Sequence, residues 1–142
     1  MLLTLDIGNT RAKLVSFVDG RPRLEAACAV SELPAAFAGI AAHRPEVTSL
    51  RWCSVGADDA LVETLLARTG WPTRRLVAAA EVGGVRLAYR TPHTLGVDRL
   101  AAVLGARSLQ PQGHLLVIDA GTCITFDVLL ADGRYIGGNI SP

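Results

Sequence analysis

Alternating apolar and polar positions at the start of the chain predict three consecutive β-strands. The first covers residues 2–8 and the second runs over 12–18. The dipeptide Asp19-Gly20 follows, a typical signal for a tight hairpin turn, and a third strand is predicted over 23–30. The chain therefore begins with strands that short turns connect.

Helical and strand patterns then alternate along the chain, which is typical of an α/β protein. The predicted elements are, in order, a helix from Ser31 to about His43, a buried strand over 49–55, a helix that Asp58 caps and Gly70 closes, a short strand and a loop within 73–90, a helix over 97–109, a strand over 114–121, and a second hairpin over 123–133 with Asp132-Gly133 at its turn. Trp52 and Trp71 are expected in the core.

The two predicted hairpins share one sequence pattern. Residues 2–21 align without a gap on residues 115–134, and eight of the twenty aligned pairs are identical. Unrelated segments of this composition would agree at about one or two such positions. Convergence explains the Asp-Gly turns, because that dipeptide is common in hairpins. It does not explain why Asp-x-Gly lies thirteen residues before the turn in both copies, so we interpret the pattern as an internal duplication.

Each copy places a carboxylate at the end of a buried strand and a glycine two residues later. Glycine lets backbone N–H groups approach an anion closely, and Asn or Thr side chains add donors. Asp6 would repel a phosphate, but it suits a Mg²⁺ ion that bridges phosphate oxygens. We therefore predict that Gly8, Asn9 and Thr10 bind nucleotide phosphates. The alternative is that Asp6 only caps the turn, with Gly8 at positive φ.

A second group of chemically active side chains lies in the stretch YRTPHTLGVDR, residues 89–99. Gly96 shapes a loop, and Asp98 and Arg99 stand at the start of the next helix. A carboxylate there can take a proton from a substrate hydroxyl, and an adjacent Arg can bind an anionic group through two hydrogen bonds. The alternative, which the residues alone favour, is that Asp98 only complements the helix dipole.

Composition and charge argue against several classes of protein. A net charge of +1 gives no basic field for nucleic acid. No apolar run reaches the roughly 18 residues of a membrane span, and Asp6 interrupts the segment where a signal peptide would lie. The three His are too far apart to support a zinc site. Cys28, Cys53 and Cys123 form no close pair, which favours a reducing, cytoplasmic location.

The motifs DIGNT, YxxPxTLGVDR, IDAGT and GGNISP occur here in an order that resembles type III pantothenate kinases, of the acetate and sugar kinase/Hsp70/actin superfamily. The resemblance implies ATP-dependent phosphorylation of pantothenate to 4′-phosphopantothenate, the first step of coenzyme A biosynthesis, by a cytoplasmic homodimer. It also implies an α/β, ribonuclease H-like or actin-like ATPase fold, duplicated, with mixed sheets flanked by helices. Neither nucleic acid nor a membrane is an expected partner.

The resemblance assigns a role to each matched residue. The implied ATP-binding residues are Asp6, Ile7, Gly8, Asn9, Thr10, Arg11, Ala12, Lys13, Gly121 and Thr122, and the implied pantothenate-binding residues are Tyr89, Gly96, Val97, Asp98 and Arg99. Asp98 would be the general base, Asp6 would lie near the Mg²⁺ of ATP, and Asp119 would bind a monovalent cation, usually K⁺. Lys13 has an alternative as a strand residue facing water, and Asp127 is interpreted as an ordinary strand residue.

By the same resemblance, residues 1–112 are the first actin-like domain and residues 113–142 the start of a second. Family members run to roughly twice the length of one such half, so we expect this chain to be a fragment without full activity. Two rival interpretations are another small-molecule kinase of the superfamily and a non-catalytic, nucleotide-binding regulatory relative. The intact acidic positions Asp6, Asp98 and Asp119, together with Thr122, weigh against the second rival.

Overall fold

A computed structural model describes residues 1–56, 59–89, 91, 94–121 and 123–142 of the chain. The chain forms two compact units, Met1–Leu76 and Val77–Pro142. Each unit contains one mixed sheet, of five strands among the described residues. The two units are described separately below. The predicted domain boundary after residue 112 follows the internal duplication of the sequence and not the division into compact units. It stays a prediction.

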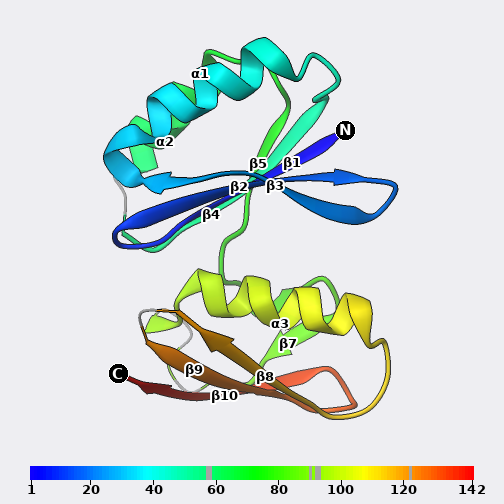
Figure 1. Cartoon of the computed structure of the whole chain (residues 1–142). Coiled ribbons are helices and arrows are strands. Elements are labelled where there is room, and N and C mark those ends of the chain that lie inside the picture. Colours follow the sequence, from blue (N-terminus) through cyan, green and yellow to red (C-terminus); the bar gives the residue numbers. More distant parts are fainter. Residues whose placement is uncertain (57–58, 90, 92–93, 122) are drawn as a thin grey trace. The chain divides into compact units, whose positions relative to one another are not determined.

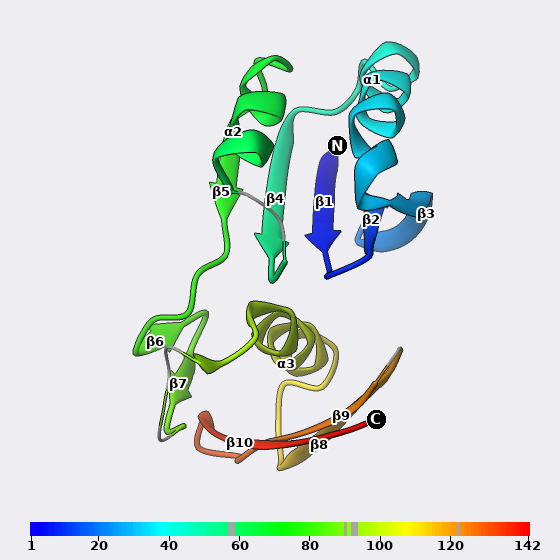
Figure 2. The same cartoon turned by 90° about the vertical axis from the view of Figure 1, so that its left-hand side faces the viewer.

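Unit 1 is a mixed sheet with two helices on one face (Figures 1 and 2). Its described elements are β1 (Leu2–Ile7), β2 (Arg11–Val18), β3 (Arg21–Ala29), the 3₁₀ turn η1 (Val30–Glu32), α1 (Leu33–His43), β4 (Ser49–Ser54), α2 (Asp59–Ala67) and β5 (Thr73–Arg75). The strand order is β3-β2-β1-β4-β5. The first three strands are antiparallel neighbours, whereas β4 runs parallel to both β1 and β5.

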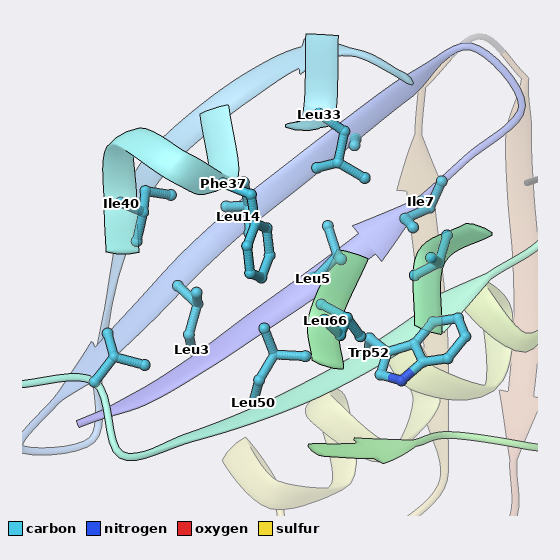
Figure 3. Packing of buried hydrophobic residues seen from close by; sticks show 13 residues of the cluster. Leu3, Leu5, Ile7, Leu14, Leu33, Phe37, Ile40, Leu50, Trp52 and Leu66 are labelled. Atoms are coloured by element: carbon cyan, nitrogen blue, oxygen red, sulfur yellow. The ribbon is translucent and has the colours of Figure 1, made fainter. Parts of the chain in front are cut away.

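Strand alternation builds the core of unit 1 between the sheet and its helices (Figure 3). Leu3, Leu5 and Ile7 point to the helix-covered face, and their exposed fractions are 0%, 1% and 0%. Helices α1 and α2 add Phe37 and Leu66 to the same cluster. Burial of each such side chain stabilises the folded state by about 2 kcal/mol before the loss of chain entropy. Trp52 and Trp71 also pack in or against this core, as predicted.

The turn residues of unit 1 adopt the conformations that their sequence predicts. Asp19 and Gly20 have φ of 51° and 73°, which are the positive values of a type I′ hairpin turn. Gly70 closes the second helix at φ 68°. The predicted capping residue of that helix, Asp58, lies outside the described residues. The first helix begins at Leu33 rather than Ser31, because the 3₁₀ turn precedes it.

Unit 2 has the described elements β6 (Glu81–Val82), β7 (Val85–Leu87), α3 (Val97–Leu109), β8 (Leu115–Ala120), β9 (Ile124–Leu129) and β10 (Arg134–Ser141). Its strand order is β6-β7-β10-β9-β8. Because β9 is antiparallel to both β8 and β10, and β7 is parallel to β10, the strands β7 and β8 run in the same direction. Helix α3 connects those two strands and covers one face of the sheet (Figures 1 and 2).

Three strands of unit 2, namely β6, β7 and β10, were not predicted from the sequence. The β6–β7 hairpin lies where a loop was expected, and its turn residues Gly83 and Gly84 have φ of 57° and 78°. The stretch GGNISP was interpreted as a loop breaker or a close backbone approach, and its first five residues belong to β10. The close approach is real: a Cβ on Gly138 would lie 1.6 Å from the carbonyl oxygen of Phe126.

The predicted pair of repeated hairpins is present, but the two differ in register. Ile7 pairs with Ala12 across the first hairpin, whereas Ala120 pairs with Ile124 across the second. The second connection is therefore one residue shorter. Because successive side chains of a strand point to opposite faces, a register shift of one residue changes which side chains of the two strands lie on the same face of the sheet.

No helix among the described residues is long and apolar enough to cross a bilayer.

Candidate functional site

The predicted phosphate loop of unit 1 lies at one edge of the sheet, where the parallel strands β1 and β4 both end. The Val55 N–H donates to the Ile7 carbonyl at 3.0 Å, which brings the connections after the two strands together. A Cβ on Gly56 would lie 2.5 Å from Oδ1 of Asn9 and 2.9 Å from its Cα. The glycine after β4 is therefore needed for the loop after β1 to take its place. Gly56 was not among the predicted site residues.

The loop itself is closed by a backbone hydrogen bond from the Gly8 N–H to the Arg11 carbonyl at 2.9 Å. A Cβ on Gly8 would lie 3.3 Å from that same oxygen. Asn9 and Thr10 are exposed at its tip. The loop thus presents polar side chains to solvent at the carboxyl edge of parallel strands, where open α/β sheets commonly bind ligands.

Asp6 lies half-buried at the end of β1, beside the thiol of Cys53 on β4. The Cys53 Sγ donates to Asp6 Oδ1 at 3.4 Å, and the two residues are paired in the strand register. On the other side, Asp6 is paired with Lys13, whose side chain is exposed. A single carboxylate suits Mg²⁺, which takes one or two protein carboxylates and completes its shell with phosphate oxygens and water. Clusters of three or more potential metal ligands do not occur among the described residues.

In unit 2 the predicted site residues lie at one edge of the sheet, because the strands that precede them run in the same direction. Tyr89 follows β7, and Asp98 lies in the first turn of α3. Asp119 lies near the end of β8, and Gly121 directly follows that strand. Because β7 and β8 are parallel and α3 returns between them, the start of the helix and the ends of both strands meet at the carboxyl edge. Asp119 is exposed there.

Asp98 is half-buried, and its own neighbours orient its carboxylate. The backbone N–H of Arg99 donates to Asp98 Oδ1 at 2.8 Å. A Cβ on Gly96 would lie 2.5 Å from the same oxygen, so only glycine leaves room for this orientation. Gly96 is also the N-cap of α3, which places the carboxylate at the positive end of the helix dipole.

Arg99 was expected to bind substrate, and its side chain is buried against the sheet. Its Nη2 lies 2.6 Å from Asp127 Oδ1, and its Nε lies 3.1 Å from both carboxylate oxygens. This hydrogen bonding raises the pKa of Arg99 above its ordinary value, against the opposing effect of burial. The hydroxyl of Tyr135 also donates to Asp127, and burial, followed by that contact, raises the pKa of Tyr135.

Asp127 and Tyr135 are the residues of this region that sequence reasoning missed. Asp127 was interpreted as an ordinary strand residue, and Tyr135 was not singled out. The sequence did offer one signal for Asp127, which is a carboxylate within an otherwise largely apolar strand. A carboxylate that is buried in such a strand needs a hydrogen-bonding or ionic partner.

Gly137 of β10 lies against Tyr89, one of the predicted substrate-binding residues. A Cβ on Gly137 would lie 2.3 Å from Cδ2 of Tyr89, so the Tyr89 ring packs against this glycine.

Arg90, Pro92, His93 and Thr122 lie outside the described residues, so the predicted contact of Thr122 with ATP stays a prediction. The two glycine loops belong to different units, and the prediction that they hold one nucleotide between them also stays a prediction.

Comparison with known proteins gives a family match over nearly the whole chain. The family model described as "Type III pantothenate kinase" matches residues 2–142. A relative of that description from Azoarcus sp. is 42% identical over 148 residues, covering 100% of this chain and 55% of its own length. One from Laribacter hongkongensis is 35% identical over 155 residues, covering 100% of this chain and 58% of its own. The chain thus spans little more than half the length of these relatives.

Solved structures show the fold. The Ppx/GppA family member of Aquifex aeolicus superposes with a TM-score of 0.50 at 13% identity, covering 99% of this chain and 50% of its own. The type II variant of the same phosphatase gives a TM-score of 0.52 at 13% identity, with 99% and 51% covered. The predicted α/β, actin-like fold with mixed sheets flanked by helices is confirmed.

Proposed function

The chain belongs to the type III pantothenate kinase family, and we propose that it transfers the γ-phosphoryl group of ATP to the primary hydroxyl of pantothenate. The product would be 4′-phosphopantothenate, in the first step of coenzyme A biosynthesis. The observation that carries the proposal is the oriented carboxylate of Asp98 at the carboxyl edge of the unit 2 sheet, within a chain that matches the family from residue 2 to residue 142.

Asp98 would act on the acceptor alcohol. Its Oδ1 is already held by the Arg99 N–H, so the carboxylate has a defined direction in which to accept the hydroxyl proton. The hydroxyl oxygen attacks the γ-phosphorus, the bond from phosphorus to the β–γ bridging oxygen breaks, and the proton passes to Asp98. In kinase-type transfer such a carboxylate mainly positions the alcohol and takes its proton late, so strong basicity is not required.

The glycine loops would hold the nucleotide. Asn9 and Thr10 offer side-chain donors to phosphate oxygens, and Asp6 would bind the Mg²⁺ ion, which neutralises the charge on the transferred group. The exposed carboxylate of Asp119 would bind the monovalent cation, proposed to be K⁺. Gly121 lies beside it, where its N–H already donates to the Cys123 carbonyl at 3.0 Å.

We further propose a cytoplasmic homodimer for the whole protein. All three cysteines are free thiols, which fits a reducing compartment. The homodimer rests on the family relationship alone, and sedimentation of the whole protein tests it.

A coupled assay of ADP release with pantothenate as acceptor tests the proposed reaction. It is performed on the 142-residue chain and on a fusion in which the unmatched part of the Azoarcus relative follows Pro142. Asp98→Asn should lower kcat by at least about a hundredfold with ATP binding retained, because the isosteric amide cannot take the proton. Unchanged turnover would remove Asp98 from the mechanism.

The acceptor range distinguishes the rival interpretations. Sugars, hydroxy acids and pantothenate are each offered as acceptor together with ATP. We expect turnover only when the acceptor is pantothenate. Turnover with another alcohol would indicate a different small-molecule kinase. ATP binding without turnover on any acceptor, in both the chain and the fusion, would indicate a regulatory relative.

A further inference from the structure

Three buried polar side chains from three elements of unit 2 bind one another. They are Arg99 of α3, Asp127 of β9 and Tyr135 of β10, with exposed fractions of 7%, 1% and 0%. The Asp127 carboxylate accepts two hydrogen bonds from Nε and Nη2 of Arg99 and one, at 2.5 Å, from the Tyr135 hydroxyl. It therefore joins the first turn of the helix to two neighbouring strands.

Stability alone is a weak reason for this cluster. A buried ion pair gains little over apolar side chains of the same volume, because removing both charges from water costs about as much as their attraction returns. The repeat supports this, since position 127 corresponds to Leu14 of the first hairpin. Leu14 is fully buried among apolar side chains of unit 1. A strand at this position of the fold can thus pack well without a charge.

The cluster is coupled directly to the proposed general base. Arg99 follows Asp98 in the chain, and its backbone N–H holds Asp98 Oδ1 at 2.8 Å. The position of that N–H depends on where the first turn of α3 lies. Asp127 fixes this turn through two hydrogen bonds to one guanidinium edge, a geometry that Arg provides and Lys cannot.

We propose that Asp127 and Tyr135 are positioning residues for Asp98 that act through Arg99, an inference that rests on the proposed phosphorylation of pantothenate. The Arg99 guanidinium anchors the helix to the sheet and is not the group that binds the substrate's carboxylate. A reacting group displaced by 1 Å can lose about a hundredfold in rate, so loosening this anchor should lower turnover before it weakens substrate binding.

The first experiment measures the anchor without any reaction. In the 142-residue chain, hydrogen–deuterium exchange of peptides covering residues 97–105 is compared for wild type, Asp127→Asn and Tyr135→Phe. Both substitutions keep the side-chain shape and remove part of the cluster, and both should speed exchange in α3. Asp132→Asn, which breaks an exposed ion pair with Arg134 in the same unit, is the control and should leave α3 unchanged. Unchanged exchange in both cluster variants overturns the proposal.

The second experiment separates positioning from substrate binding and from stability. In the active protein, Asp127→Asn and Arg99→Lys should lower kcat by about ten- to a hundredfold, with the KM for pantothenate within twofold of wild type. A raised KM at unchanged kcat in Arg99→Lys would make Arg99 a substrate ligand and overturn the proposal.

A charge-free pair, Arg99→Met with Asp127→Leu, completes the test. It should regain the melting temperature lost in Asp127→Asn without regaining kcat. Recovery of kcat together with stability would show a merely structural role. If the wild-type protein does not phosphorylate pantothenate, the proposed function fails, while the exchange experiment still decides whether Asp127 and Tyr135 hold the helix.

Discussion

Leu5 and Ile118 occupy the same position in the two copies of the repeat, 113 residues apart, and their environments are opposite. Leu5 is 1% exposed beneath the helices of unit 1, whereas Ile118 is 56% exposed. The helix of unit 2 packs against the other face of its sheet, the face that carries Asp127 and Tyr135. Burial therefore differs between the first strands of the two copies, although Leu14 in the second strand and its counterpart Asp127 are both buried.

A lysine at each of these two positions tests the difference. Leu5→Lys should lower the free energy of unfolding of unit 1 by about 3–5 kcal/mol, because an ammonium group would enter an apolar core. Ile118→Lys should change the stability of unit 2 by less than about 0.5 kcal/mol. Urea unfolding followed by circular dichroism reports both units, and tryptophan fluorescence reports unit 1, since Trp52 and Trp71 both belong to it. Equal losses in the two variants would contradict the register described here.

The contact between Cys53 and Asp6 predicts a difference between two small substitutions. Cys53→Ala removes the donor to Asp6 Oδ1 and leaves a small void, and should lower the free energy of unfolding by about 1–2 kcal/mol. Cys53→Ser keeps a donor of similar size and should remain closer to wild type. Thermal unfolding of the three proteins at pH 7 measures the effect. If the alanine variant were as stable as the serine variant, the thiol would not support the carboxylate.

Gly138 should tolerate no side chain. A Cβ there would lie 1.6 Å from the Phe126 carbonyl, so Gly138→Ala must push β9 and β10 apart and should cost more than about 2 kcal/mol. The matched control is Gly105→Ala in α3 of the same unit, where a Cβ meets nothing within 4 Å. That change should stabilise unit 2 by about 0.5–1 kcal/mol, because alanine favours the helix. Circular dichroism during urea unfolding compares the two variants.

Glu25 predicts how the stability of unit 1 depends on acid. The Ser16 hydroxyl donates to Glu25 at 2.6 Å and Arg44 binds it at 3.0 Å, and these contacts hold its pKa below the ordinary value of 4.5, against the effect of burial. Because the folded state favours the ionised form, this stabilisation is complete above the unfolded pKa and is lost as pH falls through the lower, folded pKa.

In Glu25→Gln, the free energy of unfolding of unit 1 should therefore fall less steeply than in wild type as the pH drops below about 4.5. Tryptophan fluorescence during urea unfolding between pH 3 and pH 7 measures it. The control is Glu46→Gln, which changes a far more exposed partner of the same arginine. A wild-type slope that Glu25→Gln leaves intact would show that other carboxylates carry the acid sensitivity.

Much of the local structure was predictable because short-range chemistry determines it. The apolar alternation of β1, the Asp-Gly turns and the helical spacing of 97–109 each identified their element, and the ordered motifs identified the family. The β6–β7 hairpin and β10 escaped prediction because glycine-rich segments give little hydrophobic pattern. Their strands form through pairing with distant neighbours, which the local sequence does not reveal.

The sequence by itself determined the two hairpins, their acidic and glycine positions, and the membership of the family, because turn chemistry and strand alternation act over a few residues. Only the tertiary structure decided which face of each hairpin is buried, since a one-residue change of register alters which side chains share a face. It also decided that Arg99 binds Asp127, because the two are 28 residues apart and meet only when α3 packs on the sheet.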